Sequence, residues 1–140
     1  MRNILAVMIG IFAGAIVNGA IIKVGSSLIP LPNGIDPNNF ESLKAAIPNF
    51  EPNQFLFPFL AHSIGTLVGA FITSLVSSSN KLYLALLIGF VFFVGGIYMI
   101  SILPSPIWFS VLDAVGSYFP MALIGYWLVN KYFKNRSAKQ

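Results

Sequence analysis

Four long apolar stretches limit what this chain can fold into. They run from about Ile4 to Val24, Phe55 to Val76, Leu82 to Leu103 and Ile107 to Val129. A helix needs about 20 apolar residues to cross a bilayer, because each residue rises about 1.5 Å and the hydrocarbon core is about 30 Å thick. The sequence therefore predicts an all-α fold, an integral membrane four-helix bundle formed by a single domain over residues 1–140.

The amino-acid composition excludes an ordinary soluble domain. The chain is 56% hydrophobic and only 9% charged, with a mean hydropathy of +0.81, whereas soluble domains average about 25% charged residues. It therefore lacks the polar side chains that would cover a surface in water. Cysteine is absent, which excludes disulfides, thiolate nucleophiles and iron–sulfur ligation. We expect the lipid bilayer as the main partner and no cofactor.

The connections between the four stretches predict their arrangement. Residues 77–81 form a short polar turn, and residues 104–106, Pro-Ser-Pro, break the chain between the third and fourth stretches. Short connections make neighbouring helices antiparallel, so the last three helices form an up-and-down array. Residues 25–54 are the one long connection, and with both termini on the cytoplasmic side this loop is external.

The basic residues set the expected orientation. Cytoplasmic loops of membrane proteins carry an excess of Lys and Arg. With both termini cytoplasmic, two basic residues lie outside, Lys23 and Lys44, and six lie inside: Arg2, Lys81, Lys131, Lys134, Arg136 and Lys139. Half of all basic residues fall in the last ten positions, in the expected cytoplasmic tail of residues 130–140. Membrane orientation explains this surplus better than nucleic-acid binding, and we expect a multi-pass protein of a bacterial plasma (inner) membrane.

A second interpretation of the N-terminus stays open. Arg2, the apolar run after it and the small residues 13–15 also fit a cleaved signal peptide. The apolar run continues past that point to Ile22, which is long for a cleaved segment. We therefore favour four retained helices.

The external loop predicts a short amphipathic helix. Asp36 followed by Pro37 is a good helix start, with Asp as N-cap and Pro in the first turn, and Pro48 ends the segment after about ten residues. Three apolar residues recur on one helical face: Phe40, Leu43 and Ile47. This helix would lie on the outer membrane surface or act as a lid over the opening of the bundle.

Glycine spacing predicts which helix faces pack together. Gly10 and Gly14 form a GxxxG pair in the first stretch, and Gly65 and Gly69 repeat it in the second. Small residues at this spacing let helix backbones approach closely in a membrane, where lipid supplies no hydrophobic drive between helices.

Two ionisable residues lie inside the apolar stretches, His62 and Asp113. An aspartate at the centre of a membrane helix is unfavourable by roughly 2.5–3.5 kcal/mol, so such a residue usually faces a partner, a cavity or water. Counted from the outer ends of their helices, His62, Asp113, Asn18 and Tyr98 all lie about 8–12 Å deep at about 1.5 Å per residue. The sequence therefore predicts a polar site in the outer half of the bundle.

The expected core of this site is a hydrogen bond or ion pair between His62 and Asp113. A carboxylate that accepts from an imidazole fixes its tautomer and raises its proton affinity. The other candidates would satisfy the remaining donors and acceptors: Asn18, Tyr98, Ser63, Thr66 and Ser117. The same pair can instead be structural, because polar pairs between membrane helices contribute about 0.6 kcal/mol to packing on average.

Several kinds of chemistry find little support in the sequence. A metal site wants three or four ligands, and only His62, Asp113 and Glu51 could converge, so no metal is expected. Ser63 neighbours His62 in sequence but points to a different helix face, and no nucleophile-elbow motif is present. A Ser-His-Asp triad is therefore disfavoured. No phosphate-binding GxxxxGK loop occurs either.

Three functions remain. The first is a small membrane protein that binds, or helps to translocate, a small ligand or proton at the His62–Asp113 site, with a homo-oligomer needed for any continuous pore. The second is a membrane enzyme with His62 as general base, acting on a lipid or quinone-like substrate. The third is a structural or accessory subunit that packs through its glycine faces into a larger membrane complex.

Overall fold

The computed structural model describes residues 1–29, 31, 35–36 and 39–137, with side chains described up to residue 132. In these parts of the chain it is all-helical, as predicted. The long helices are α1 (Arg2–Leu28), α3 (Leu56–Val76) and α4 (Lys81–Ile102), followed by the consecutive pair α5 (Ile107–Gly116) and α6 (Phe119–Ser137). Counting α5 and α6 together, these make four segments long and apolar enough to cross a membrane.

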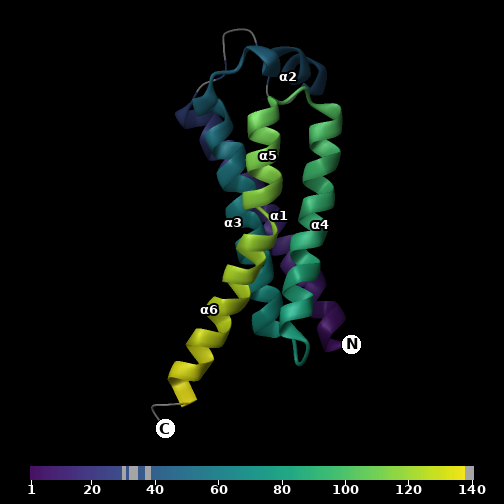
Figure 1. The fold of residues 1–140 in the computed structure, drawn as a ribbon, viewed down its shortest axis with the longest axis vertical. Coiled ribbons are helices and arrows are strands. Elements are labelled where there is room, and N and C mark those ends of the chain that lie inside the picture. Colours follow the sequence, from purple (N-terminus) through teal and green to yellow (C-terminus); the bar gives the residue numbers. More distant parts are fainter. Residues whose placement is uncertain (30, 32–34, 37–38, 138–140) are drawn as a thin grey trace.

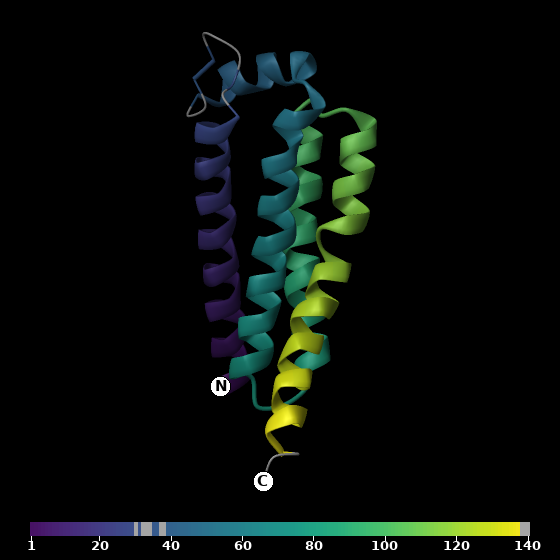
Figure 2. The same ribbon diagram turned by 90° about the vertical axis from the view of Figure 1, so that its left-hand side faces the viewer.

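Helix α3 lies at the centre of the bundle. It packs against α1 along most of its length and also against α4 and α6, whereas α1 and α4 contact each other only weakly. The short helix α2 lies across one end of the bundle, and the N-terminus and the turn between α3 and α4 lie at the other (Figures 1 and 2). We call these the α2 end and the N-terminal end.

Over its described residues, the connection between α1 and α3 holds three short helical segments. These are α2 (Phe40–Ala46) and two 3-10 turns, η1 (Ile47–Asn49) and η2 (Pro52–Phe55). Helix α2 begins later than the sequence predicts: its N-cap is Asn39, not Asp36. The Asn39 side chain accepts a hydrogen bond from the Ser42 backbone N–H at 3.1 Å, which satisfies one of the free N–H groups at the helix start. Pro37, expected in the first turn, lies outside the described residues.

Close backbone contact joins α1 to α3. A Cβ atom at Gly14 would lie 2.7 Å from the Gly65 carbonyl oxygen, and one at Gly69 would lie 2.9 Å from the Gly10 carbonyl oxygen. Both distances are too short for a real side chain, so the two helices approach this closely only because these positions are glycine. The Thr73 hydroxyl donates to the Ala6 carbonyl at 3.2 Å within the same interface.

The fourth apolar stretch is broken, which the sequence analysis missed by treating 107–129 as one helix. Helix α5 ends at Gly116 and α6 begins at Phe119. The cause is Pro120, which has no N–H to donate to the Gly116 carbonyl and whose ring would clash with it. Proline also disfavours helical geometry in the residue before it. Helix α6 continues into the expected tail as far as Ser137, and residues 138–140 lie outside the described part.

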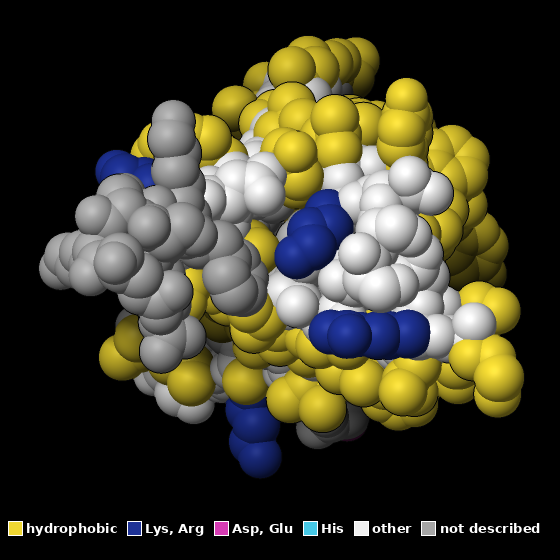
Figure 3. Space-filling view, turned by 90° about the horizontal axis from the view of Figure 1, so that it is seen from below, with side chains coloured by type: hydrophobic (Ala, Val, Ile, Leu, Met, Phe, Trp, Pro, Cys, Tyr) yellow, Lys and Arg dark blue, Asp and Glu magenta, His cyan; other side chains and the backbone are white. Residues whose placement is uncertain are grey.

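Of the five basic residues whose side chains are described, three lie at the N-terminal end, and Lys23 and Lys44 lie toward the α2 end. Arg2 begins α1, Lys81 begins α4 and Lys131 lies near the end of α6, and Figure 3 looks onto this end and its Lys and Arg side chains. The Arg2 Nε donates to the Val76 carbonyl at 2.7 Å, which ties the start of α1 to the end of α3. The side chains of Lys134 and Arg136, and the whole of Lys139, are outside the description. The cytoplasmic orientation of this end stays a prediction.

The glycine contact can be tested with a matched pair of variants on α1. In Gly10→Ala the new methyl group would overlap Thr73 and lie 2.6 Å from the Gly69 carbonyl oxygen, whereas in Gly19→Ala it meets nothing within 4 Å. We expect Gly10→Ala to lower the stability by about 1–3 kcal/mol, as overpacking does, and Gly19→Ala to leave it unchanged or raise it, because alanine favours helix. Thermal unfolding in detergent measures both; equal melting temperatures would contradict the α1–α3 contact.

Candidate functional site

The structure brings His62 and Asp113 into direct contact. The His62 Nδ1 lies 2.9 Å from one oxygen of the Asp113 carboxylate and 3.0 Å from the other. Asp113 is fully buried and the His62 side chain is 22% exposed. They come from the second turns of two different helices, α3 and α5, both near the α2 end. The pair is therefore a shared polar centre of two helices.

Two hydroxyl groups complete the surroundings of the carboxylate. Ser117 donates to one Asp113 oxygen at 2.8 Å, and Tyr118 donates to the other at 2.6 Å. With His62, three donors therefore converge on one buried carboxylate. Charge-assisted hydrogen bonds of this kind are stronger than neutral ones, and they replace the water that the aspartate loses on burial.

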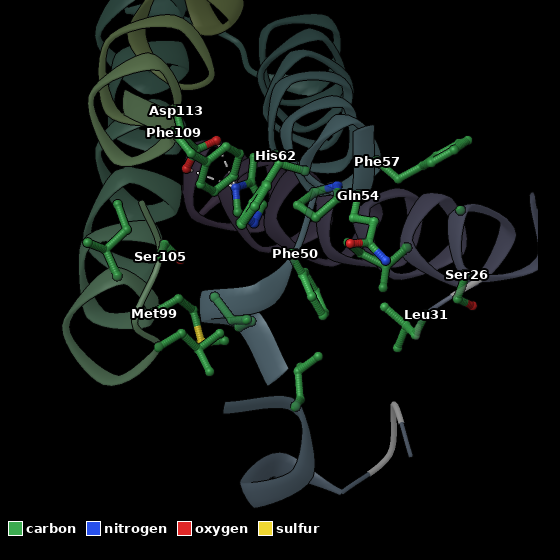
Figure 4. A pocket seen from close by; sticks show the side chains of 18 of the residues that line it. Ser26, Leu31, Phe50, Gln54, Phe57, His62, Met99, Ser105, Phe109 and Asp113 are labelled. Atoms are coloured by element: carbon green, nitrogen blue, oxygen red, sulfur yellow. Dashed lines mark hydrogen bonds and ion pairs between the residues drawn. The ribbon is translucent and has the colours of Figure 1, made fainter. Parts of the chain in front are cut away.

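The geometry assigns the imidazole tautomer. The Nδ1 of His62 is within 3.2 Å of both Asp113 oxygens and of the Tyr118 oxygen, and the Tyr118 hydrogen is already committed to Asp113. Each of these three oxygens can therefore only accept a hydrogen bond that Nδ1 donates. In the neutral ring the proton thus sits on Nδ1, and the lone pair of Nε2 is free. No described residue hydrogen-bonds Nε2. Figure 4 shows the imidazole held to Asp113 on one side, with its other nitrogen turned toward the cavity.

The helix break places Tyr118 at this site. In a continuous helix, Tyr118 would point about 140° away from Asp113, since successive residues turn by about 100°. The break at residues 117–118 lets both face the same carboxylate, and Tyr118 stacks on the His62 ring with centroids 6.0 Å apart. Gly96 of α4 makes room for it, because a Cβ at Gly96 would overlap the Tyr118 hydroxyl. Tyr118 was not among the site residues predicted from the sequence; the helix break that Pro120 causes was the signal that could have indicated it.

Two further candidates, the hydroxyl groups of Ser63 and Thr66, stabilise the His62–Asp113 pair through the groups next to it. The Ser63 hydroxyl donates to Ser117 at 3.0 Å, which itself donates to Asp113. The Thr66 hydroxyl donates to the His62 backbone carbonyl at 2.7 Å, so it fixes the helix at His62 and does not contact the carboxylate. Both side chains are buried. They hold His62 and Asp113 in position and do not line the cavity.

Asn18 and Tyr98 are not part of the same cluster. Asn18 packs against α3, where its Cβ would be 3.1 Å from a Cβ at Gly65. The Tyr98 side chain is 62% exposed on the outside of α4. Neither makes a hydrogen bond to His62 or Asp113 among the described contacts. Equal depth along the helices therefore did not imply a shared face.

A cavity of about 270 Å³ opens in front of the pair. Its walls come from α1, α3, α4 and α5 and from the segment that holds α2, and most of its lining side chains are apolar. His62 and Asp113 are the ionisable groups among the described lining residues. This combination of apolar walls and a few oriented polar groups is typical of small-molecule sites.

The α2 segment forms a cover over this cavity. Leu43 and Ile47, from the predicted apolar stripe, line the cavity, and Ile47 is buried in a cluster with Phe55 and Phe109. Phe40, the third stripe residue, remains exposed. We call residues 40–49, which comprise α2 and η1, the lid. Their packing fits the lid interpretation of this segment better than a helix lying free on the membrane surface.

The site offers little to a metal ion. His62 and Asp113 are two potential ligands, and within the described residues no third His, Asp or Glu joins them. Most protein zinc sites use three or four ligands. A nucleophile is also not in place, because the Ser63 hydroxyl is bonded to Ser117. Binding and proton transfer at Nε2 are the chemistry that this arrangement supports.

Comparison with known proteins gives no further guide to the activity. No protein-family model matches the chain, and no curated protein or solved structure is significantly similar to it. The function is therefore argued from the site alone.

Removal of the tyrosine hydroxyl tests the three-donor arrangement. In Tyr118→Phe the carboxylate keeps Ser117 and His62 but loses its shortest hydrogen bond, of 2.6 Å. We expect a loss of about 1–2 kcal/mol in stability, since hydrogen bonds to charged groups are stronger than average but are moderated between membrane helices. Tyr98→Phe is the control and should be neutral. Melting temperatures that fall equally in both variants would contradict the arrangement.

Two adjacent glycines of α4 offer a second, steric test. Gly96→Ala would push its methyl group into the Tyr118 hydroxyl, whereas Gly95→Ala has nothing within 4 Å. We expect Gly96→Ala to destabilise the protein by about 1–3 kcal/mol and Gly95→Ala to be neutral or slightly stabilising. Combining Gly96→Ala with Tyr118→Ala should remove much of the steric cost, because the new methyl group clashes with the tyrosine hydroxyl and with the ring carbon Cζ, 2.6 Å away. An additive double variant would mean that the two residues do not meet.

Proposed function

We propose that this chain is a multi-pass membrane protein that binds a small, mainly apolar molecule carrying one hydroxyl group. The molecule occupies the cavity under the lid and donates its hydroxyl hydrogen to His62 Nε2. The observation that supports this most is the free Nε2 facing an apolar cavity while Nδ1 is held by a buried carboxylate. A polar anchor in an apolar cavity fixes the orientation of its ligand.

The volume limits the size of the ligand. An engineered apolar cavity of about 150 Å³ binds benzene. By proportion, the cavity of about 270 Å³ takes on the order of ten non-hydrogen atoms. That is the size of a single substituted ring or of the ring-bearing end of a longer lipid.

The proposed setting is the plasma membrane, with both termini in the cytoplasm. The basic residues Arg2, Lys81 and Lys131 lie at the N-terminal end, and cytoplasmic ends of membrane proteins are enriched in such residues. Acidic Glu41 and Glu51 lie at the α2 end. In this orientation the cavity belongs to the outer half of the membrane.

Binding is favoured over conduction through the bundle. Toward the N-terminal end from the site, the backbones of α1 and α3 are in contact at Gly10, Gly14, Gly65 and Gly69. This leaves no room for a path between them. The buried cluster of Ala70, Ala85, Ile88 and Ala122 packs α3, α4 and α6 together, so we expect a translocation function to need a route between several copies of the chain.

A second candidate function is a membrane enzyme with His62 as general base. A carboxylate that holds Nδ1 leaves Nε2 ready to take a proton from a substrate, and the same contact between His62 and Asp113 supports this function. Loss of turnover of a lipid-soluble substrate in folded His62→Gln would favour it. The accessory-subunit function gains less support, because the glycine faces are already occupied by each other.

Binding can be measured at the single histidine of the chain. Protein labelled with ¹⁵N-histidine is placed in nanodiscs and titrated with 4-propylphenol, while the Nε2 resonance is followed. We expect a saturable shift. Propylbenzene, which lacks the hydroxyl, should bind about fivefold more weakly when measured by competition, because one hydrogen bond contributes about 1 kcal/mol.

A matched pair of variants controls for unspecific effects of a phenol in lipid. Ile100→Trp fills the cavity, because Ile100 lines it, and should abolish the shift. Val94→Trp changes an exposed position of the same helix that does not line the cavity and should preserve the shift. An unchanged Nε2 resonance in the wild-type protein, or the same shift in Ile100→Trp, would refute the proposed site.

A further inference from the structure

Within the described residues, the most exposed part of the cavity lining comes from α1 and α4. Among the described lining residues, the exposed ones are Ile22 and Ser26 of α1 and Met99 of α4. Ile22 and Met99 are each 39% exposed although they line the cavity. Residues that belong both to a cavity and to the molecular surface mark its opening. We call these three residues the side opening.

The packing of α1 and α4 explains why they part here. The two helices touch near the middle of the bundle, where the Phe92 ring would be 2.7 Å from a Cβ at Gly14. Met99 lies two helical turns beyond Phe92, and Ile22 lies about two turns beyond Gly14, both toward the α2 end. Along the rest of their length α1 and α4 contact each other only weakly. The opening therefore lies on the α2 side of the contact between Gly14 and Phe92.

The lid covers part of the cavity at the α2 end of the bundle. Ile47 of the lid is 5% exposed and packs with Phe55 and Phe109, which are equally buried. The rings of Phe55 and Phe109 lie 4.7 Å apart between their centroids. This cluster holds the lid against η2 and α5.

We propose that ligands enter this cavity sideways from the bilayer, between α1 and α4, and that the ligand is an uncharged, lipid-soluble alcohol or phenol. This rests on the proposed binding function. Both helices that flank the side opening are long and apolar enough to span the membrane, so in the proposed setting the opening faces the outer half of the bilayer. The Ser26 hydroxyl is already bonded to the Lys23 carbonyl at 2.8 Å, which leaves an apolar rim that favours neutral ligands.

The route can be followed with a single cysteine, because the chain has none of its own. Ile47→Cys puts a thiol on the inner side of the lid, in the cavity lining. Proteoliposomes of this variant are treated with N-phenylmaleimide, which partitions into lipid, or with a membrane-impermeant sulfonated maleimide. We expect N-phenylmaleimide to react at least about tenfold faster, because a sulfonate enters an apolar passage only at high cost. Rates are corrected for the reactivity of each reagent with a free thiol.

Blocking the side opening supplies the matched control. In the Ile47→Cys background, Met99→Trp should slow the reaction with N-phenylmaleimide about tenfold, because the larger side chain obstructs the opening. Ile97→Trp changes an exposed residue of α4 outside the cavity lining and should leave the rate unchanged. If Ile47→Cys does not fold, Leu43→Cys on the same face of the lid serves the same purpose.

The outcomes separate this inference from the binding function. Equal rates for the two maleimides, or equal rates in Met99→Trp and Ile97→Trp, would show that ligands pass under the lid from water, and would overturn the sideways route. A wild-type protein that fails to respond to 4-propylphenol at His62 while the labelling pattern holds would instead overturn the binding function and leave the route standing.

Discussion

The buried Asp113 carboxylate imposes the main constraint on this fold. A charged group among apolar helices is unfavourable unless donors surround it, and here His62, Ser117 and Tyr118 all donate to it. Each donor makes a structural demand: α3 must approach α5, α5 must end within a turn of Asp113, and α4 must leave space for a tyrosine hydroxyl. The hydrogen bonds of the site and the packing of the helices therefore depend on each other.

Proline and glycine meet these demands. Pro120 ends α5 at the position where Tyr118 can turn back toward the carboxylate. Gly96 supplies the space for its hydroxyl. At the other end of the bundle, Gly10 and Gly69 bring α1 against α3. In this arrangement α1 packs closely along α3 and separates from α4 on the α2 side of Phe92. The tight glycine contact and the opening near the lid both follow from it.

The comparison of sequence with structure shows which features depend on local signals. Apolar length alone predicted the four spans, and the pairing of His62 with Asp113 followed from the cost of isolated charge in lipid. Depth along the helix did not place Asn18 or Tyr98, because depth says nothing about which face a residue occupies. Tyr118 was missed because helical periodicity was continued through Pro120. The cavity depends on how α1 and α4 diverge, and that is a property of packing between distant segments.

The central claim is that the Asp113 carboxylate holds the imidazole proton on Nδ1 and leaves Nε2 bare toward the cavity. The ¹⁵N spectrum of the single histidine, recorded without ligand at a pH where the ring is neutral, tests it directly. Our account predicts a protonated Nδ1 and an unprotonated Nε2 in the wild-type protein, with this preference lost in Asp113→Leu. A proton on Nε2, or an equal mixture of tautomers in both proteins, would contradict the account.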